Sequence, residues 1–487
     1  MSITPDFSRF KKEYEAGHNQ VIFAKLTSDL DTPVSIMLKL AGAKKNSFIL
    51  ESVTGGETRG RYSIIGMEPD LIWKCEGDKS FINSGNNEFN HVEGNPLTIF
   101  RNLLKQSAIN LPEDLPQASA GLFGYFGYDM VRHVEDLPNV NPDKIGLPDA
   151  MFIRPSIIAV LDGVKGEVIL VSPVFYNKNT SSNQAFEKAL KKIEDAIYEL
   201  RKQIVTNRNL GKSGEIEEPS SNFTKEEYKS AVKKAKAYIN QGDIFQVVPS
   251  QRWTQKFPYS PFALYRSLRR TNPSPFMFFF NFADFQIIGA SPEILVRLRE
   301  GEITVRPIAG TRPRGKTIKE DRFYEKDLLR DKKELSEHLM LLDLGRNDAG
   351  KVSKTNSIKV TESFIIERYS HVMHIVSNVI GKHDKRFSKF KSLLAGFPAG
   401  TVSGAPKIRA MEIIDELEST KRKVYAGGIG YFAANGEFDT CIALRTAVAK
   451  NNRFYVQAGA GIVADSKPLK EYEETVNKAK ALINALK

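Results

Sequence analysis

Short runs of alternating apolar and polar residues dominate this chain, and most of them are bounded by glycine, proline or asparagine. This pattern is typical of antiparallel strands joined by tight turns. We predict strands at 20–27, 47–53, 121–129, 244–253, 293–299, 302–308 and 370–381, and a buried strand within 272–282. Because hairpins dominate and strand–helix–strand repeats are not evident, the predicted fold class is α/β of the α+β type, with large antiparallel sheets flanked by helices.

Two turns near the end of the chain predict how its last strands pair. Two-residue hairpin turns are expected at Asn435-Gly436 and at Asn451-Asn452. These turns would bring Tyr425, Arg445 and the Gly459–Gly461 backbone together on neighbouring strands. A guanidinium beside open N–H groups suits a carboxylate, so an anion site is predicted there.

A third turn, at Glu300-Gly301, predicts where an acidic side chain lies. The hairpin would place Glu293 opposite Ile308 and so beside Gly310 and Thr311. Gly-Thr after an apolar strand offers N–H groups and a hydroxyl to an anion, and a carboxyl group at this point is placed for acid catalysis. The alternative is a Ser-Pro-Glu turn with a solvated carboxylate.

Helical spacing of apolar residues marks a second set of segments. Helices are predicted at 5–16, within 177–220, from Thr224 to Gly242, from Asp331, at 406–418 and at the end of the chain. Thr224 and Glu227 form a capping box, and Ser403 is the predicted N-cap of the helix from Pro406. The predicted buried faces are Leu335, Leu339 and Leu342 on one helix and Leu469, Tyr472, Val476, Ala479 and Ile483 on the last.

Two of these helices carry paired carboxylates. Glu334 and Glu337 project to one side of the first helix, and Glu471 and Glu474 do so on the last, with Lys478 one turn further on. A charged helix face is usually only solvated. If the two pairs meet, however, they make a hard-cation site of the kind that Mg²⁺ accepts together with water and a substrate oxygen.

Length and composition bound the domain count and the compartment. With 487 residues the chain exceeds the size at which one core stops growing, and a polar stretch suggests a division into 1–205, a linker at 206–222, and 223–487. The two cysteines, Cys75 and Cys441, form neither a disulfide framework nor a metal knuckle, and no apolar signal or membrane-spanning run is present, so a cytoplasmic location is expected. The net charge of +12 is scattered along the chain, which favours a lysine-rich solvated surface over nucleic-acid binding.

Several motifs, taken together and in order, resemble those of a known family. They are PIAGTRPRG from Pro307, KELSEHLMLLDLGRND from Lys333, SHVMH from Ser370, GTVSGAPKIRAM from Gly400 and QAGAG from Gln457. From about Phe48 to about Ala481 the chain resembles the chorismate-utilising enzymes, and among them the anthranilate synthase component I family. The resemblance implies the two-layer fold of these enzymes, Mg²⁺ as cofactor, and conversion of chorismate and ammonia to anthranilate and pyruvate in tryptophan biosynthesis.

The resemblance also implies roles for single residues. Glu293 is the expected general acid for the departing C4 hydroxyl, and His374 the expected group for pyruvate elimination. Family members that add water to chorismate carry a lysine base at Gln246, and a glutamine cannot deprotonate water. The relative that makes aminodeoxychorismate carries a nucleophilic lysine at Ala309, so here ammonia must attack C2 directly.

Ligand contacts are carried over in the same way. The metal is assigned to Glu337 and Glu474, with Glu334 and Glu471 in the outer shell. The substrate-binding positions are Gly310, Thr311, Tyr425, Arg445, Gly459, Gly461 and Lys478. A site for inhibitory tryptophan is implied at Leu50, Glu51, Ser52, Pro275, Phe276, Met277, Ile429, Gly430 and Tyr431. Phe276 departs from the tyrosine often found there, and His371 receives no role.

The chain offers no obvious source of ammonia. Neither cysteine lies in a nucleophile turn and no length is spare for an amidotransferase domain, so a separate glutamine amidotransferase subunit, component II of the resembled enzyme, and a hetero-oligomer are expected. The alternatives are an aminodeoxychorismate-forming enzyme, which Ala309 opposes, and isochorismate or salicylate formation, which Gln246 opposes. A non-catalytic regulatory or nucleic-acid-binding protein with the same fold is the alternative of another class.

Overall fold

In the computed structural model, which describes residues 3–42, 44–52, 60–85, 88–204, 217–256, 259–369 and 372–485, two long bent strands hold the sheet together. These are β4 (Tyr62–Glu76) and β8 (Ala150–Asp162), which pair along almost their whole length with an irregularity between Pro69 and Leu71. Each half of these strands then pairs with different neighbours, so that the sheet divides into two wings.

The first wing runs from β4 through β3 (Ser47–Glu51), β13 (Phe276–Asn281), β14 (Gln286–Ser291), β23 (Thr446–Lys450) and β24 (Arg453–Gly459) to β12 (Ser250–Lys256) and β10 (Ser220–Ser221). The second wing runs from β8 through β7 (Gly121–Phe126), β21 (Gly428–Ala433), β22 (Phe438–Ile442), β15 (Ile294–Arg299) and β16 (Glu302–Val305) to β19 (Val372–Lys382), which also pairs with β17 (Ile308–Pro313) and β18 (Lys359–Arg368). The remaining strands are β1 (Ile3–Thr4), β2 (Gln20–Thr27), β5 (Lys79–Asn83), β6 (Asn90–Val92), β9 (Glu167–Val174), β11 (Gln246–Val247) and β20 (Gly404–Ala405).

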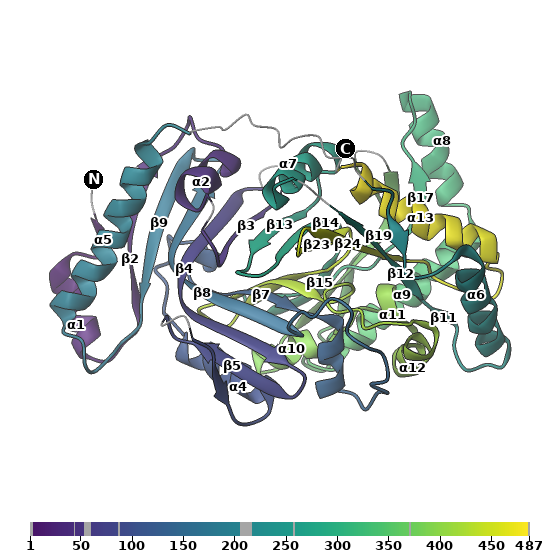
Figure 1. Cartoon of the computed structure of the whole chain (residues 1–487), viewed down its shortest axis with the longest axis horizontal. Helices are drawn as coiled ribbons and strands as arrows, with labels where there is room; N and C mark the ends of the chain where they lie inside the picture. The colour runs from purple at the N-terminus through teal and green to yellow at the C-terminus, as the bar shows by residue number, and fades with distance from the viewer. Residues whose placement is uncertain are drawn as a thin grey trace.

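Helices cover the outer faces of both wings, as Figure 1 shows. In that view α1 (Phe7–Glu15) and α5 (Ser182–Arg201) lie together against β2 and β9 at the left, whereas α6 (Lys225–Asn240), α9 (Lys332–Gly350), α12 (Lys407–Leu417) and α13 (Pro468–Asn484) gather at the right. The other helices are α2 (Pro33–Leu40), α4 (Pro96–Gln106), α7 (Pro261–Thr271), α8 (Ile318–Leu328), α10 (Lys389–Ala395) and α11 (Gly400–Ser403), with 3₁₀ turns at Gln117–Ser119 and Tyr128–His133. Among the helices of the described residues, none is long and apolar enough to cross a bilayer.

Aromatic rings fill the space between the two wings. The Phe48 ring lies 4.5 Å from that of Phe123 and 5.4 Å from that of Phe280, so strands of both wings meet here. Gly66 is required opposite Phe48, because a Cβ at Gly66 would lie 2.4 Å from the ring. Burial of each ring contributes about 1.5–3 kcal/mol, so this cluster ties the wings together.

The predicted fold class is confirmed, and several predicted elements keep their bounds. The capping box of Thr224 and Glu227 is present, and the hairpin at Asn451-Asn452 has the predicted register, Lys450 opposite Arg453. The division at 206–222 stays a prediction, and residues 206–216 lie outside the described part. Strands from both sides of that stretch pair within one sheet, since β3 lies beside β13 and β7 beside β21.

Two strand predictions were wrong, each at a proline. The strand predicted at 244–253 is broken at Pro249 into β11 and β12, because proline cannot donate to a ladder and Val248 N–H turns to Ser403 O instead. The hairpin at Glu300-Gly301 has the predicted register, but its ladder ends at the pair of Arg297 and Thr304, before Pro307, so Glu293 does not pair with Ile308. The carbonyl of Glu293 instead accepts a hydrogen bond from Ile442 N–H of β22.

The turn at Asn435-Gly436 was also predicted incorrectly. Phe432 pairs with Phe438, and Ala433 N–H donates to Glu437 O, which leaves a loop of Ala434, Asn435 and Gly436. Gly436 has φ +80°, as expected for the left-handed last residue of a three-residue loop. The extra loop residue shifts the predicted register by one.

Helix faces and one cap were predicted with errors as well. Leu339 and Leu469 are half exposed, whereas His338 and Glu471, which the predicted buried faces did not include, are buried. Ser403 ends α11 and donates its hydroxyl hydrogen to Ala399 O, so it does not cap α12. A count of apolar residues at helical spacing does not reveal that a polar site occupies the inner face of α9 and α13.

Candidate functional site

The helix α9 brings two carboxylates to the region where the two wings end. Asp331 caps its N-terminus by accepting hydrogen bonds from Lys333 and Glu334 N–H, and His338, fully buried, lies 2.7 Å from the Ser377 hydroxyl through its Nε2. This anchor to β19 turns Glu334 and Glu337 inward. Burial raises the pKa of Glu337, and the charges of Glu334 and Glu474 raise it further.

The final helix brings the second carboxylate pair to the same place. Glu471 is buried, and burial raises the pKa of its carboxyl. Glu474 forms an ion pair with Lys478 at 2.8 Å, and Lys478 Nζ also donates to Gly459 O at 3.0 Å. α13 is thus fixed to the end of β24, and the charge of Glu474 is near enough to raise the pKa of Glu337 on α9.

A neutral imidazole lies on the second wing. His374 of β19 is opposite Thr311 of β17, and its Nδ1 lies 2.9 Å from Gly310 O and 3.2 Å from the Thr311 hydroxyl. Burial lowers the pKa of His374 to about 4. Gly310 has φ +63°, and a Cβ there would lie 3.3 Å from Glu334 Oε2, so this bulge brings the backbone close to the carboxylates of α9.

A buried carboxyl lies beside these strands. Glu293 precedes β15, and burial raises its pKa to about 8, although the Thr401 hydroxyl and Ile308 N–H act in the opposite direction. Glu293 and Ile308 are therefore neighbours, as predicted, but through the side chain of Glu293 and not through pairing of the two strands. A carboxyl group with this pKa is protonated at neutral pH and can donate a proton.

Gln246 connects β11 to α9. Its Nε2 donates to Glu337 Oε1 at 3.1 Å, and its Oε1 is buried without a hydrogen-bond partner among the described residues. Gly461 lies directly beside it, because a Cβ at Gly461 would be 2.6 Å from Gln246 Nε2 and 3.7 Å from Glu337 Oε1. Buried amide oxygens are normally paired, so an open acceptor here is a place for a ligand donor.

The predicted anion site is assembled around Tyr425 and Arg445. Gly459 is needed beside Tyr425, because a Cβ there would lie 2.9 Å from the Tyr425 hydroxyl, and burial raises the pKa of this tyrosine to about 12. Arg445 has φ +47°, and burial lowers the pKa of its guanidinium. Within the described part of the chain this guanidinium has no hydrogen-bond or ion-pair partner. A buried cation of this kind favours an anionic ligand.

The carboxylates of α9 and α13 fit a divalent cation. Within the described ranges, no group of three or more His, Cys, Asp or Glu side chains is arranged to hold a metal. Mg²⁺ needs only one or two carboxylates when water and substrate oxygens complete its shell. Burial, together with the charges of Glu334 and Glu474, raises the pKa of Glu337, and a cation beside Glu337 would offset both effects.

The residues of the predicted tryptophan site come together only in part. β3 lies beside β13, with Leu50 opposite Phe278, and Leu50, Phe276, Ile429 and Tyr431 pack on one cluster between the wings. Glu51 points to the other face, where Arg269 Nε donates to it at 2.7 Å and the Tyr265 hydroxyl also donates. Met277, opposite Glu51, shares that other face.

Gly430, Pro275 and Ser52 complete this region. Gly430 permits a close approach to β22, because a Cβ there would lie 2.1 Å from Asp439 O. Pro275 immediately precedes β13, and Ser52 follows β3. His371, to which no role was assigned, lies outside the described residues.

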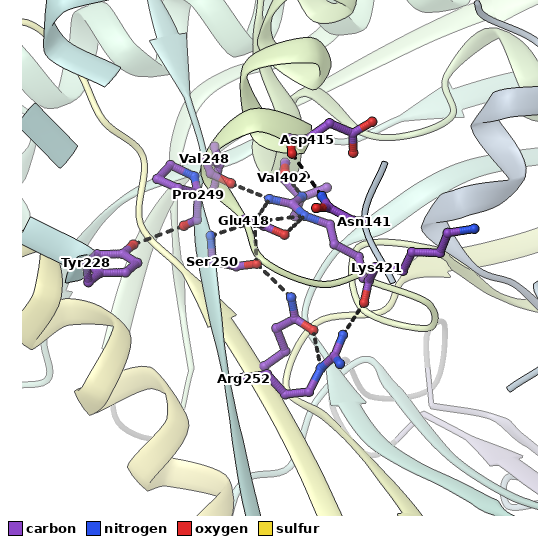
Figure 2. A network of polar contacts seen from close by, with 12 residues as sticks. Asn141, Tyr228, Val248, Pro249, Ser250, Arg252, Val402, Asp415, Glu418 and Lys421 are labelled. Atoms are coloured by element: carbon purple, nitrogen blue, oxygen red, sulfur yellow. Dashed lines mark hydrogen bonds and ion pairs between the residues drawn. The ribbon is translucent and has the colours of Figure 1, made fainter. Parts of the chain in front are cut away.

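Sequence reasoning missed a buried ion pair behind the site. Arg422 and Glu418 form it, with side chains 1% and 3% exposed. Figure 2 shows Glu418 and Ser250 in the surrounding network. The only sequence signal is a charged pair, four residues apart, immediately after a helix that is otherwise apolar on one face. That pattern usually indicates a solvated helix end.

Comparison with known proteins agrees with this geometry. The profile of the chorismate binding enzyme family matches residues 45–484. Anthranilate synthase component 1 of Cereibacter sphaeroides is 61% identical over 483 residues, which cover 98% of this chain and 97% of that protein. The crystal structure of anthranilate synthase component I from Streptococcus pneumoniae aligns with a TM-score of 0.77 at 37% identity, over 94% of this chain and 98% of that one.

A more distant structure shares the fold. The menaquinone-specific isochorismate synthase from Escherichia coli aligns with a TM-score of 0.72 at 18% identity, over 98% of this chain and 99% of that one. Since the family profile and a relative of high identity both span nearly the whole chain, this protein belongs to the chorismate-binding enzymes and, within them, to the anthranilate synthase component 1 family.

Proposed function

We propose that this chain converts chorismate and ammonia into anthranilate, pyruvate and water. The observation that carries the proposal is the buried carboxyl of Glu293, whose pKa of about 8 leaves it protonated where a hydroxyl must depart. The high identity to a protein named anthranilate synthase component 1 supports it.

Substrate carboxylates would be held at two points. The guanidinium of Arg445, which has no hydrogen-bond or ion-pair partner among the described residues, suits the enolpyruvyl carboxylate together with the Tyr425 hydroxyl and the backbone at Gly459 and Gly461. The second carboxylate, on the ring, would lie toward the N–H groups of Gly310 and Thr311 and toward α9 and α13. Lys478, already bonded to Gly459 O, would add positive charge between the two points.

Glu337 and Glu474 would hold Mg²⁺, with Glu334 and Glu471 behind them. When bound, the ion would neutralise the ring carboxylate and withdraw electron density from the ring. Gln246 fixes the orientation of Glu337 by donating to its Oε1, which leaves the other oxygen of that carboxylate for the cation.

In the first step ammonia attacks C2, the ring double bonds shift, and the C4 hydroxyl leaves as water with the proton of Glu293. Ala309 supplies no competing nucleophile, and Gln246 supplies no base for water. The open Gln246 Oε1 instead accepts an N–H of the incoming ammonia and holds its lone pair toward C2.

In the second step the C2 proton is removed and the enolpyruvyl group leaves as pyruvate, which makes the ring aromatic. The low pKa of His374 keeps the imidazole neutral. With Nδ1–H donating to Gly310 O, Nε2 carries the free lone pair and serves as the base. Thr311 holds the ring of His374 in this orientation.

Ammonia would come from glutamine through a separate amidotransferase subunit, so the working enzyme is a hetero-oligomer in this proposal. Both cysteines of the chain are buried, and burial raises the pKa of each thiol, which makes either a poor nucleophile for releasing ammonia. Tryptophan would bind the cluster of Leu50, Phe276, Ile429 and Tyr431 and inhibit turnover.

The test is to mix the purified chain with chorismate, Mg²⁺ and an ammonium salt and to follow anthranilate fluorescence and pyruvate. Equal amounts of both products are expected with ammonium and none with glutamine alone. Accumulation of an amino-chorismate without pyruvate would refute the second step and favour the aminodeoxychorismate alternative. A hydroxylated product without nitrogen would refute the role of Gln246.

A further inference from the structure

Arg422 uses its guanidinium to join segments that each carry part of the substrate site. Its Nε and Nη2 donate to Glu418, Nη1 donates to Val402 O at 2.7 Å, and Nη2 donates to Val248 O at 2.6 Å. Val248 lies two residues after Gln246, and Val402 follows Thr401, whose side chain lies near the carboxyl of Glu293. These bonds leave the guanidinium few donors for a ligand.

Glu418 extends this network to the end of β24, where Gly459 lies. Its Oε1 accepts hydrogen bonds from Ser250 N–H at 2.8 Å and from the Ser250 hydroxyl at 2.7 Å. Ser250 is the register partner of Gly459, and the Gln457 amide also donates to the Ser250 hydroxyl at 2.8 Å. Figure 2 shows this path from Val248 and Val402 through Glu418 to Ser250.

The same guanidinium lies over Tyr425. Its central carbon is 5.5 Å from the centre of the Tyr425 ring and 4.8 Å from that of the Tyr128 ring. Cation–π contact in a buried place fixes the plane of a ring. The Tyr425 hydroxyl is therefore held where only a glycine, Gly459, leaves space for it.

We propose that Arg422 and Glu418 are positioning residues of the substrate site: their ion pair holds Tyr425, the Gly459 strand, the Gln246 segment and the Thr401 helix in the geometry that binds chorismate. Neither side chain touches the substrate. The inference rests on the proposed function for its substrate, but the network itself is independent of it.

The test compares Glu418→Gln with Asp415→Asn. Asp415 lies three residues earlier, on α12, and is equally a buried carboxylate paired with an arginine, Arg132 at 2.7 Å; among the described residues its side chain has no hydrogen bond or ion pair with the substrate segments. Each variant removes one buried charge, Asp415 from the last turn of α12 and Glu418 from the residue that follows the helix. A loss of stability alone would therefore be similar in the two, whereas a change in positioning would appear only in Glu418→Gln.

With ammonium as nitrogen source, Glu418→Gln and Arg422→Lys are expected to raise the KM for chorismate by about tenfold or more, since small displacements of binding groups are costly. Asp415→Asn is expected to keep the KM within about twofold of wild type. Unchanged KM in Glu418→Gln and Arg422→Lys, or an equal rise in Asp415→Asn, would overturn the proposal.

Hydrogen exchange of the free protein tests the network without any turnover. Amides of residues 245–251 and 459–462 are expected to exchange faster in Glu418→Gln and to remain protected in Asp415→Asn. Equal protection in both variants would refute the positioning role even if the wild-type chain proved inactive on chorismate. If the two variants show this difference in exchange but the wild-type chain does not convert chorismate, the proposed function is refuted and the positioning network remains supported.

Discussion

Two buried groups at the candidate site owe opposite pKa shifts to the same cause. Removal from water penalises the charged form, so the pKa of Glu293 rises to about 8 and that of His374 falls to about 4. Both groups are neutral at physiological pH. The site thus holds a proton donor and a proton acceptor at the same time, without charge on either.

The pH dependence of kcat/KM should show both groups. Turnover needs Glu293 protonated and His374 neutral, so activity is expected to rise through about pH 4, stay level, and fall through about pH 8. The measurement must hold free ammonia constant, because ammonium deprotonates as pH rises. Activity that continues to increase above pH 9 would refute Glu293 as the acid, and Glu293→Gln should reduce kcat about 100-fold or more.

The same shift of Glu293 has a consequence for stability. The folded state keeps a proton that the unfolded chain releases near its ordinary pKa of 4.5, so the free energy of unfolding is expected to fall as pH rises from about 4.5 to 8. Glu293→Gln removes this contribution. Thermal unfolding of the variant should therefore depend less on pH in that interval than unfolding of the wild type.

Glu337 should illustrate a conflict between stability and function. Burial and the neighbouring carboxylates disfavour its charge, so Glu337→Gln is expected to raise the melting temperature in EDTA. The same change should abolish the stabilisation by Mg²⁺ and lower activity at least about 100-fold. The control is Glu473→Gln, an exposed carboxylate beside Glu474, which should change neither property. Wild-type activity in Glu337→Gln at saturating Mg²⁺ would refute the metal assignment.

At the scale of elements, the accuracy of the sequence predictions depended on whether local residues alone decide the structure. Asn451-Asn452 has φ +51° and +57°, which asparagine tolerates, and the two-residue turn then fixes the register. Asn435-Gly436 offers the same local signal, but its loop takes a third residue, Ala434, whose N–H bonds to Ala120 O of the neighbouring segment. That competing partner lies about 310 residues away in the chain and cannot be seen locally.

The residues of the candidate site also differ in whether the sequence alone could reveal them. Glu293, Glu337 and His374 could be named as candidates because the motifs around them resemble those of the family, and their roles stay predictions. Arg422 and Glu418 could not, because their importance comes from the carbonyls of Val248 and Val402, which any sequence would supply. A contact with a backbone carbonyl cannot be predicted from the type of residue that carries it.

The hairpin at Asn451-Asn452 allows a test at this scale. Asn452→Val puts a β-branched residue at φ +57° and is expected to lower the free energy of unfolding by about 1–2 kcal/mol. Asn452→Gly is the matched control and should be neutral or slightly stabilising. Chemical denaturation followed by circular dichroism measures both, and equal stability of the two variants would show that the turn is not decisive.

At the scale of the molecule, the two candidate ligand sites lie at opposite ends of the same pair of wings. Leu50, Phe276 and Tyr431 pack near the strands where the wings divide, whereas Gly459 and His374 lie where the wings end. Strands β13, β14, β23 and β24 lead from one region to the other by direct pairing. A ligand that wedges the wings apart at one end would therefore alter their spacing at the other.

Ser52 provides the test of this arrangement. Ser52→Phe adds bulk immediately after β3, and tryptophan inhibition is expected to weaken about tenfold or more while kcat with ammonium stays near wild type. Inhibition curves at fixed chorismate give the result. Unchanged inhibition would remove Ser52 and the end of β3 from the effector site.

Pairing between distant segments also sets a condition on synthesis. β7 ends at Phe126, yet its partner β21 begins at Gly428, roughly 300 residues later in the chain. In the same way, β3 is synthesised long before its partner β13. At ribosomal rates of about 5–20 residues per second, β7 remains without this partner for about 15–60 s. During that time its apolar side chains, Phe123 and Phe126 among them, lack the strand that covers them in the finished enzyme. The nascent chain is thus an expected client of chaperones until its last third has left the ribosome.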